Sequence, residues 1–71
     1  MIVDPEKRIV TIDYTNWRGE RRERDIYPMK VWFGSTKQHP QEQWLLKAMA
    51  MDKEEVREFA MSGIHSWRPR W

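Results

Sequence analysis

Arginines and aromatic residues gather in two stretches of the sequence. The first stretch holds Arg18, Arg21, Arg22 and Arg24, and the second is the C-terminal run 67–71, Trp-Arg-Pro-Arg-Trp. A guanidinium beside an aromatic ring suits phosphate contact and base stacking, so both stretches point to a nucleotide or nucleic-acid ligand. The alternative is a solvated strand face whose charges compensate one another, because Glu20, Glu23 and Asp25 are interleaved with the arginines.

The sequence contains no set of residues with the spacing of a catalytic site. Its serines lack a base and an orienting acid at any suggestive spacing, since the only histidines are His39 and His65. Two distant histidines without cysteine do not predict a zinc site. The glycines Gly19, Gly34 and Gly63 are too isolated to form a phosphate-binding loop. We therefore expect no enzyme activity, no metal and no cofactor.

Length and composition set the outer limits. The chain has 71 residues, a formal net charge of +2 and no cysteine. One small domain, residues 1–71, is expected, near the size at which a single core is marginal. The charge alone is too small to indicate a nucleic-acid binder. Without a signal-peptide pattern or a stretch of about 18 apolar residues, we expect a cytoplasmic protein with no membrane contact.

The first half of the chain favours a β-hairpin. Residues 10–15 alternate between apolar and polar side chains, the period of two that is typical of a half-buried strand. Residues 16–19, Asn-Trp-Arg-Gly, supply turn chemistry, because Asn and Gly tolerate a positive φ. A second strand is expected within residues 20–33, where Pro28 marks an edge or a bulge because it has no N–H to donate. Residues 34–43 are predicted to form a polar loop.

Two interpretations are open for residues 41–61. The segment is rich in Gln, Glu, Leu, Lys, Ala and Met, which are good helix formers, and its apolar residues fall at roughly helical spacing. Against a helix, the polar run 52–55 interrupts the apolar pattern and can form a tight turn. The residues Trp44, Leu46, Ala48 and Ala50 alternate as they do in a strand.

The order and spacing of several residues resemble the WYL domain, a bacterial ligand-sensing module named for Trp-Tyr-Leu. The similarity runs from about Ile9 to Ile64 and is carried by Ile12, Asp13, Tyr14, Asn16, Gly19, Arg24, Ile26, Pro28, Trp44, Leu46, Ala48, Arg57 and Phe59. Leu45 stands where the family has its tyrosine, so an apolar side chain replaces a phenol that could hydrogen-bond a ligand.

The resemblance implies that residues 43–61 form two antiparallel strands. With the first hairpin they would make an all-β domain, a small strongly bent antiparallel sheet or barrel of SH3-like or Sm-like type. A β-hairpin plus a helix is the fallback. The core is expected at about residues 8–64, followed by a C-terminal tail, residues 65–71.

A ligand site is implied by the same resemblance. Arg24 and Arg57 match basic positions that, in family members, line a pocket for nucleic-acid-derived ligands. Their guanidinium groups can engage phosphate with two donors at once. His39, in the loop before the Trp-Leu-Leu segment, is expected to add a pH-sensitive donor. The alternative is that both arginines are exposed or paired with carboxylates and that His39 is solvated. Lys53, in the turn at 52–55, is expected to lie far from this site.

Tryptophan is abundant for so short a chain, with five residues. Tyr14, Trp44 and Phe59 are expected in the core, as apolar residues at alternating strand positions. Trp17, Trp32, Trp67 and Trp71 cannot all fit inside, so some are expected on the surface or in an interface. Together with an unpaired sheet edge, this excess of tryptophan predicts a homodimer.

Members of the family usually carry a helix-turn-helix segment before this domain, whereas only about eight residues precede the first expected strand here. We therefore expect a stand-alone sensor or accessory domain. The favoured function is a noncatalytic regulatory domain that binds a nucleotide or a short single-stranded nucleic acid. The alternative is a homo-oligomeric protein-interaction module without a small ligand, for which Leu45 is the main argument.

Overall fold

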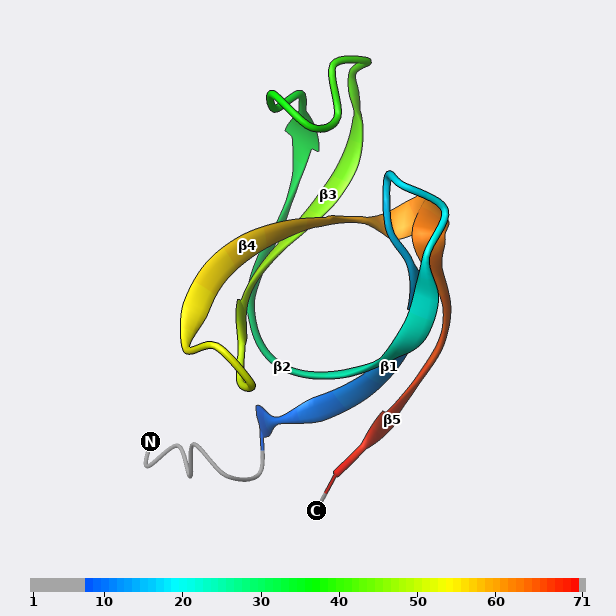
Figure 1. The fold of residues 1–71 in the computed structure, drawn as a ribbon. Helices are drawn as coiled ribbons and strands as arrows, with labels where there is room; N and C mark the ends of the chain where they lie inside the picture. Colours follow the sequence, from blue (N-terminus) through cyan, green and yellow to red (C-terminus); the bar gives the residue numbers. More distant parts are fainter. Residues whose placement is uncertain (1–7, 71) are drawn as a thin grey trace.

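The computed structural model describes residues 8–70. Antiparallel strands form one five-stranded sheet in the order β4-β3-β2-β1-β5 (Figure 1). Their bounds are β1 Val10–Thr15, β2 Arg21–Gly34, β3 Gln43–Ala50, β4 Glu55–Ala60 and β5 Ile64–Pro69, with a 3-10 helix, η2, at Met61–Gly63. The predicted all-β fold is confirmed, and residues 8–70 contain no α-helix. Within the described residues, no helix is long and apolar enough to cross a membrane.

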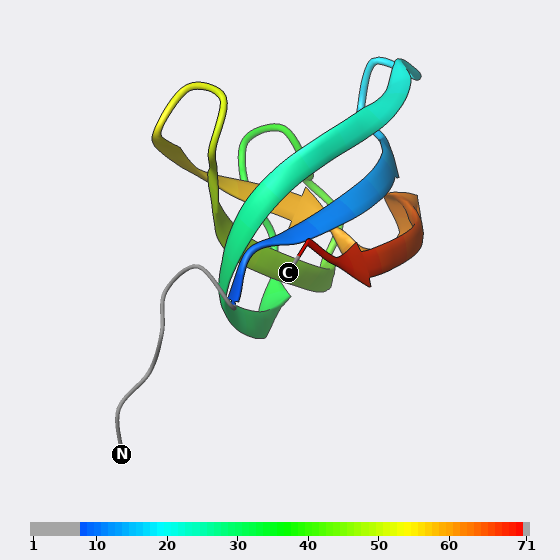
Figure 2. The same ribbon diagram turned by 90° about the horizontal axis from the view of Figure 1, so that it is seen from below.

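The sheet bends strongly because β2 belongs to two hairpins. Residues 21–26 pair with β1, and residues 26–34 pair with β3. The register of β2 against β3 shifts between Pro28 and Lys30, which confirms the predicted bulge, since proline cannot donate to the ladder. Figure 2 shows β2 following β1 and then turning away. The strand order ends at β4 and β5, so the sheet is bent but not closed into a barrel.

The turn between β1 and β2 forms where the sequence predicts it. The side chain of Asn16 accepts hydrogen bonds from the backbone N–H groups of Arg18, at 2.9 Å, and Glu20, at 3.0 Å. Gly19 has a φ of 83°, a conformation that suits glycine. These contacts fix the register that places Tyr14 opposite Arg22.

Residues 43–61 form the two strands β3 and β4, joined by a turn over residues 51–54, so the helical fallback is wrong. The strand period places Leu46, Ala48 and Ala50 together on the buried side of β3. A helix, which turns 100° per residue, would point Ala48 away from the other two. Tertiary burial therefore outweighs the weak helical propensity of this segment.

The core lies on the inner face of the bent sheet. It consists of Ile12, Tyr14, Ile26, Leu46, Ala48, Ala50 and Phe59. Tyr14 and Phe59 meet edge to face, with ring centroids 5.1 Å apart. The hydroxyl oxygen of Tyr14 accepts a hydrogen bond from the backbone N–H of Ala60 at 3.0 Å. The expectation that Tyr14 and Phe59 are core residues is confirmed.

Trp44 is not a core residue, contrary to expectation. Its side chain is 57% exposed and packs edge to face on Phe33, which is its cross-strand partner, at a centroid distance of 5.3 Å. The reason is position, because Trp44 lies at the start of β3, where the β2–β3 hairpin extends beyond the other strands (Figure 1). The next residue, Leu45, is fully buried.

The other tryptophans divide between surface and partial burial. Trp17 and Trp67 are exposed, as expected for a chain with too many indoles for its core. Trp32 is half-buried, and its indole N–H donates to a carboxylate oxygen of Glu58 at 2.9 Å. Trp71 lies outside the described residues.

The C-terminal segment is a strand where a tail was predicted. Residues 64–69 form β5, which pairs with β1, and the hydroxyl of Thr15 lies 2.7 Å from the Nε2 atom of His65. Pro69 sits at the end of β5, on an edge strand, where the loss of one donor is tolerated. Without β5 the outer edge of β1 would be left unpaired.

Candidate functional site

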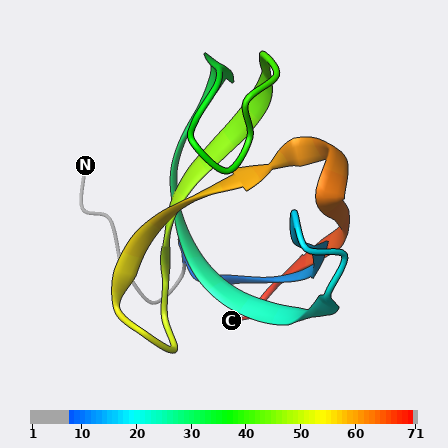
Figure 3. The same ribbon diagram turned by 45° about the horizontal axis from the view of Figure 1, so that its top comes forward.

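A cleft of about 410 Å³ opens at one end of the inner face, and we call it the arginine cleft. The three residues expected to bind a ligand, Arg24, His39 and Arg57, all line it. Arg24 comes from β2 and Arg57 from β4. His39 comes from the loop between β2 and β3, which returns toward β4 (Figure 3). The structure thus brings together residues that are far apart in the sequence.

Arg24 is a buried cation with unused hydrogen-bond donors. Its side chain is 8% exposed, and its Nε and Nη2 atoms have no hydrogen-bond partner among residues 8–70. The nearest carboxylate is that of Asp52, whose Oδ1 lies 3.7 Å from Nη2, which is too long for a hydrogen bond. Burial, with repulsion from Arg22, lowers the pKa of Arg24. Arginine still carries its charge at neutral pH, so its donors remain unsatisfied at a real energetic cost.

Two aromatic rings position the Arg24 guanidinium. Its Cζ atom lies 5.6 Å from the centre of the Phe59 ring, within the range of a cation–π interaction. Tyr14 supports Phe59 from the side. Burial raises the pKa of Tyr14, so its hydroxyl is neutral at physiological pH. The aromatic pair therefore holds the cation in place without neutralising it.

Arg57 fits the alternative in which the arginine is exposed or paired with a carboxylate. Its side chain is 41% exposed, and its Nη2 atom donates to Glu55 Oε2 at 3.0 Å, on the same strand. An exposed ion pair of this kind contributes little stability, so it offers only weak competition to a bound anion. Arg57 thus supplies a second, more exposed cation beside the buried Arg24.

His39 is buried rather than solvated, since the residue is 8% exposed. Its backbone N–H donates to both the carbonyl and the hydroxyl oxygen of Thr36, and its carbonyl accepts from the N–H of Thr36 at 2.9 Å. These bonds fold the loop into a tight turn that presents His39 to the cleft. Whether its ring donates to a ligand remains a prediction.

A second hollow, of about 470 Å³, shares Arg24 and Arg57 with the arginine cleft. It adds the cations Arg18, Arg22 and Lys53, while Glu20 is the only acidic residue among the described residues that line it. We call it the basic extension. Lys53 was expected to be distant, but the bend of the sheet carries the β3–β4 turn over β2, where Asp52 Oδ2 lies 3.5 Å from Arg22 Nη2.

Trp17 lines both the arginine cleft and the basic extension and was not predicted as a site residue. Its ring is exposed, with the guanidinium of Arg18 stacked 5.0 Å from its centre. Its place in the turn beside Arg18, just before the arginine-rich start of β2, was the available signal. Leu45, by contrast, lines neither hollow, so the missing tyrosine hydroxyl does not alter their walls.

The arrangement suits an anion with several acceptor oxygens. Two cations, one of them buried with free donors, face one cleft. The carboxylates of Glu55 and Glu58 also line it, but they accept hydrogen bonds from Arg57 and Trp32. Further cations continue from the cleft into the basic extension. Within residues 8–70 no group of three or more His, Cys, Asp or Glu side chains could hold a metal ion.

Comparison with known proteins identifies the family. The family model of the WYL domain matches residues 5–69, which includes β5 and thus extends beyond the similarity recognised in the sequence. No curated protein and no solved structure gives a significant match. WYL domains are generally regulatory, noncatalytic, ligand-sensing domains. The protein described here belongs to the WYL domain family.

Proposed function

We propose that the arginine cleft binds a phosphate-bearing ligand, either a nucleotide or a short single-stranded nucleic acid, and that the domain acts as a noncatalytic sensor of it. The observation that carries the proposal is Arg24, a buried guanidinium with two unpartnered donor atoms in a cleft. Keeping a charged group with unsatisfied donors out of water is costly, and proteins retain such costs mostly at functional sites. A bound anion would offset this cost.

Phosphate suits the cleft better than a single carboxylate. The Nε and Nη2 atoms of one guanidinium can reach two phosphate oxygens at once. The basic extension provides cations for a further phosphate, and the exposed ring of Trp17 is available for stacking with a base. His39, which also lines the cleft, is proposed as an additional hydrogen-bond donor.

Binding is tested by titrating the protein with a cyclic dinucleotide and with a short single-stranded oligonucleotide at several salt concentrations. Affinity is expected to fall as salt rises, because each neutralised phosphate releases counterions. Arg57→Ala should cost about 1.5–3 kcal/mol of binding free energy, the size of a hydrogen bond to a charged group. Arg57→Lys should restore part of this, since it keeps the charge but loses the fork.

Arg21→Ala is the matched control. Arg21 lies on the same strand as Arg24 and carries the same charge, but it pairs with Asp13 at 2.8 Å and lines neither hollow. It should change affinity little. If the wild type binds neither ligand at low salt, or if Arg57→Ala binds as well as the wild type, the proposal fails.

A homo-oligomeric interaction module is the second candidate function. The observation in its favour is the exposed pair Phe33 and Trp44 on the projecting β2–β3 hairpin, because exposed aromatic residues are enriched in interfaces. Sedimentation at micromolar concentration should then show a dimer that Trp44→Ser disrupts. A monomer at hundreds of micromolar would remove this candidate. For either function we propose the bacterial cytoplasm as the compartment, since a chain without cysteine needs no oxidising environment.

A further inference from the structure

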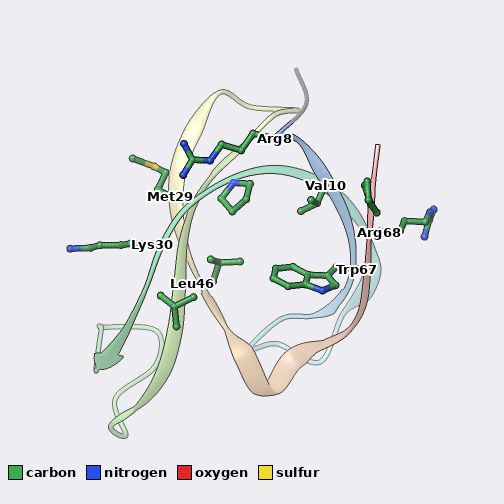
Figure 4. Close-up of a pocket in the computed structure, with 10 residues that line it drawn as sticks. Arg8, Val10, Met29, Lys30, Leu46, Trp67 and Arg68 are labelled. Atoms are coloured by element: carbon green, nitrogen blue, oxygen red, sulfur yellow. The ribbon is translucent and has the colours of Figure 1, made fainter. Parts of the chain in front are cut away.

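A second cavity lies on the inner face of the sheet, with core residues between it and the arginine cleft. We call it the apolar groove. It has a volume of about 470 Å³. Figure 4 shows Val10 from β1, Leu46 from β3 and Trp67 from β5 pointing toward its middle. Along β1, the inward residue Ile12 separates Val10 in the groove from Tyr14 in the arginine cleft. The two sites are therefore separate.

The walls of the apolar groove offer few hydrogen-bond donors. Pro28 and Pro69 both line it, and proline has no backbone N–H. Val31 is 50% exposed and Trp67 is 54% exposed, so much apolar surface is in contact with water. Burying such surface is favourable in proportion to its area. The groove thus suits an apolar body.

The rim of the groove has one sign of charge. Arg8, Lys30 and Arg68 line it, and no aspartate or glutamate does so among the described residues. Arg68 is paired with Glu23 at 2.6 Å, and Arg8 stacks on Tyr27. Lys30 has no ion pair within residues 8–70. Figure 4 shows Arg8 and Lys30 on the same side of the groove, with Lys30 extending outward from the rim.

We propose that the apolar groove binds a small amphipathic anion, a carboxylate with a medium-length hydrocarbon chain. The chain lies against Val31, Leu46 and Trp67. The carboxylate stays at the mouth, where Arg8 and Lys30 can turn toward it. The volume falls within the range of small-molecule sites, and a largely apolar lining with a few polar groups is their usual composition.

The rim distinguishes this ligand from other occupants. A second copy of the chain carries a net charge of +2 and would meet a basic rim, which is an unfavourable combination. A nucleotide base would find few backbone donors to pair with along the proline-containing walls. A ligand with an apolar body and one anionic head is complementary to both the apolar walls and the basic rim. This proposal does not depend on the function proposed for the arginine cleft.

The probe is a series of octanoate, decanoate and dodecanoate, each below its micellar concentration, added to the full chain labelled with ¹⁵N. The indole N–H signal of Trp67 should shift saturably, while those of Trp17 and Trp44 should not. Affinity should rise by up to about fourfold per methylene until the groove is filled, as expected from hydrophobic transfer.

Two variants and their matched controls test the residues. Val31→Asp places a charge in the groove and should abolish binding, whereas Phe33→Asp, on the same strand and 53% exposed but outside the groove, should not. Lys30→Glu should weaken binding roughly tenfold or more, the scale of a lost charge-assisted hydrogen bond. Lys37→Glu, in the exposed loop, should have little effect. Circular dichroism confirms that each variant keeps its strands.

Three results would overturn the proposal. Equal affinity for decanol or decyltrimethylammonium would show that the rim does not select an anion. Shifts at Trp17 that disappear in Arg57→Ala would place the fatty acid in the arginine cleft. Shifts of the Trp67 signal on protein dilution alone, with a dimer in sedimentation that Val31→Asp dissociates, would show that a second copy covers the groove.

Discussion

The arginine cleft and the apolar groove both take residues from neighbouring inward positions of β1 and β2, yet the chemistry of their linings is opposite. On β2 the inward residues Arg24, Ile26 and Pro28 pass from the cleft through the core to the groove. One end buries a cation with unused donors, and the other leaves apolar side chains in water. Each end is unfavourable in water in a way that a ligand would relieve, and we propose a different ligand for each.

The difference shows that a small sheet can separate two chemical environments with only a few buried side chains. Ile12 and Ile26, both fully buried, stand between the two hollows. A side chain removed there should affect both ends at once, whereas a side chain changed at either end should affect that end alone.

Ile26→Ala is expected to have the largest effect on stability. Removing a buried aliphatic side chain of this size costs about 2–5 kcal/mol, which is a large fraction of the stability of a domain this small. Urea unfolding followed by tryptophan fluorescence measures the change. Val56→Ala, at an exposed position of β4, is the control and should stay within about 0.5 kcal/mol. An equally small change for Ile26→Ala would contradict the placement of Ile26 in the packed core.

Arg24→Met should act in the opposite direction on stability. Arg24 is a buried cation with only a loose ion pair to Asp52 and two donors without partners. Replacing it with an apolar side chain of similar length should raise the free energy of unfolding, on the order of 1–4 kcal/mol. The same variant should lose the stabilisation that a cyclic dinucleotide gives to the wild type in thermal unfolding. A less stable Arg24→Met protein would show that Arg24 is compensated in the folded chain and that the cleft is not strained.

Tyr14→Phe should cost about 1–3 kcal/mol, because it leaves the buried N–H of Ala60 without an acceptor. The pH dependence gives an independent check. Since burial raises the pKa of Tyr14 in the folded state, its stabilising contribution is complete below its ordinary pKa of about 10 and is lost as pH rises through the raised value. The variant should lack this alkaline loss. If both proteins show the same loss, another group is responsible.

Asp13→Asn should have the smallest effect on stability, because Asp13 lies in the β1–β2 hairpin and lines neither the arginine cleft nor the apolar groove. The hydrogen bonds from Arg21 lower the pKa of Asp13, so the stabilisation is present above the ordinary carboxyl pKa and is lost as pH falls through the lowered value. Thermal unfolding should therefore separate wild type and variant slightly at neutral pH and less at strongly acidic pH. A difference that grows in acid would contradict the assignment.

Local signals were sufficient for much of the fold. The alternation at residues 10–15, the Asn16 to Gly19 turn and the proline bulge each depend on a few neighbouring residues, and each is confirmed. Residues 43–61 needed the family resemblance, because their residue propensities taken alone favour a helix. β5 was missed because its partner, β1, is distant in the sequence and its residues lack a clear apolar alternation.

The sequence was sufficient to predict which residues lie together in the candidate site, but not how their hydrogen bonds are satisfied. Arg24, His39 and Arg57 do line one cleft. The sequence could not show that two donors of Arg24 lack hydrogen-bond partners, because the interleaved acidic residues suggested compensation. Only the three-dimensional register decides which carboxylate each arginine meets. Trp44 and Lys53 were misplaced for the same reason, since the bend of the sheet determines which strand ends leave the core and which turns approach it.

The bend in β2 lies between the two hollows. One strand supplies Arg24 to the cleft and, past the bulge at Pro28, Val31 to the groove. If filling one hollow changes the bend, it changes the affinity of the other, and thermodynamic linkage requires the reverse effect to have the same factor. A double titration of phosphate-bearing ligand and fatty acid would measure that factor directly and show whether this domain integrates two signals or reports them separately.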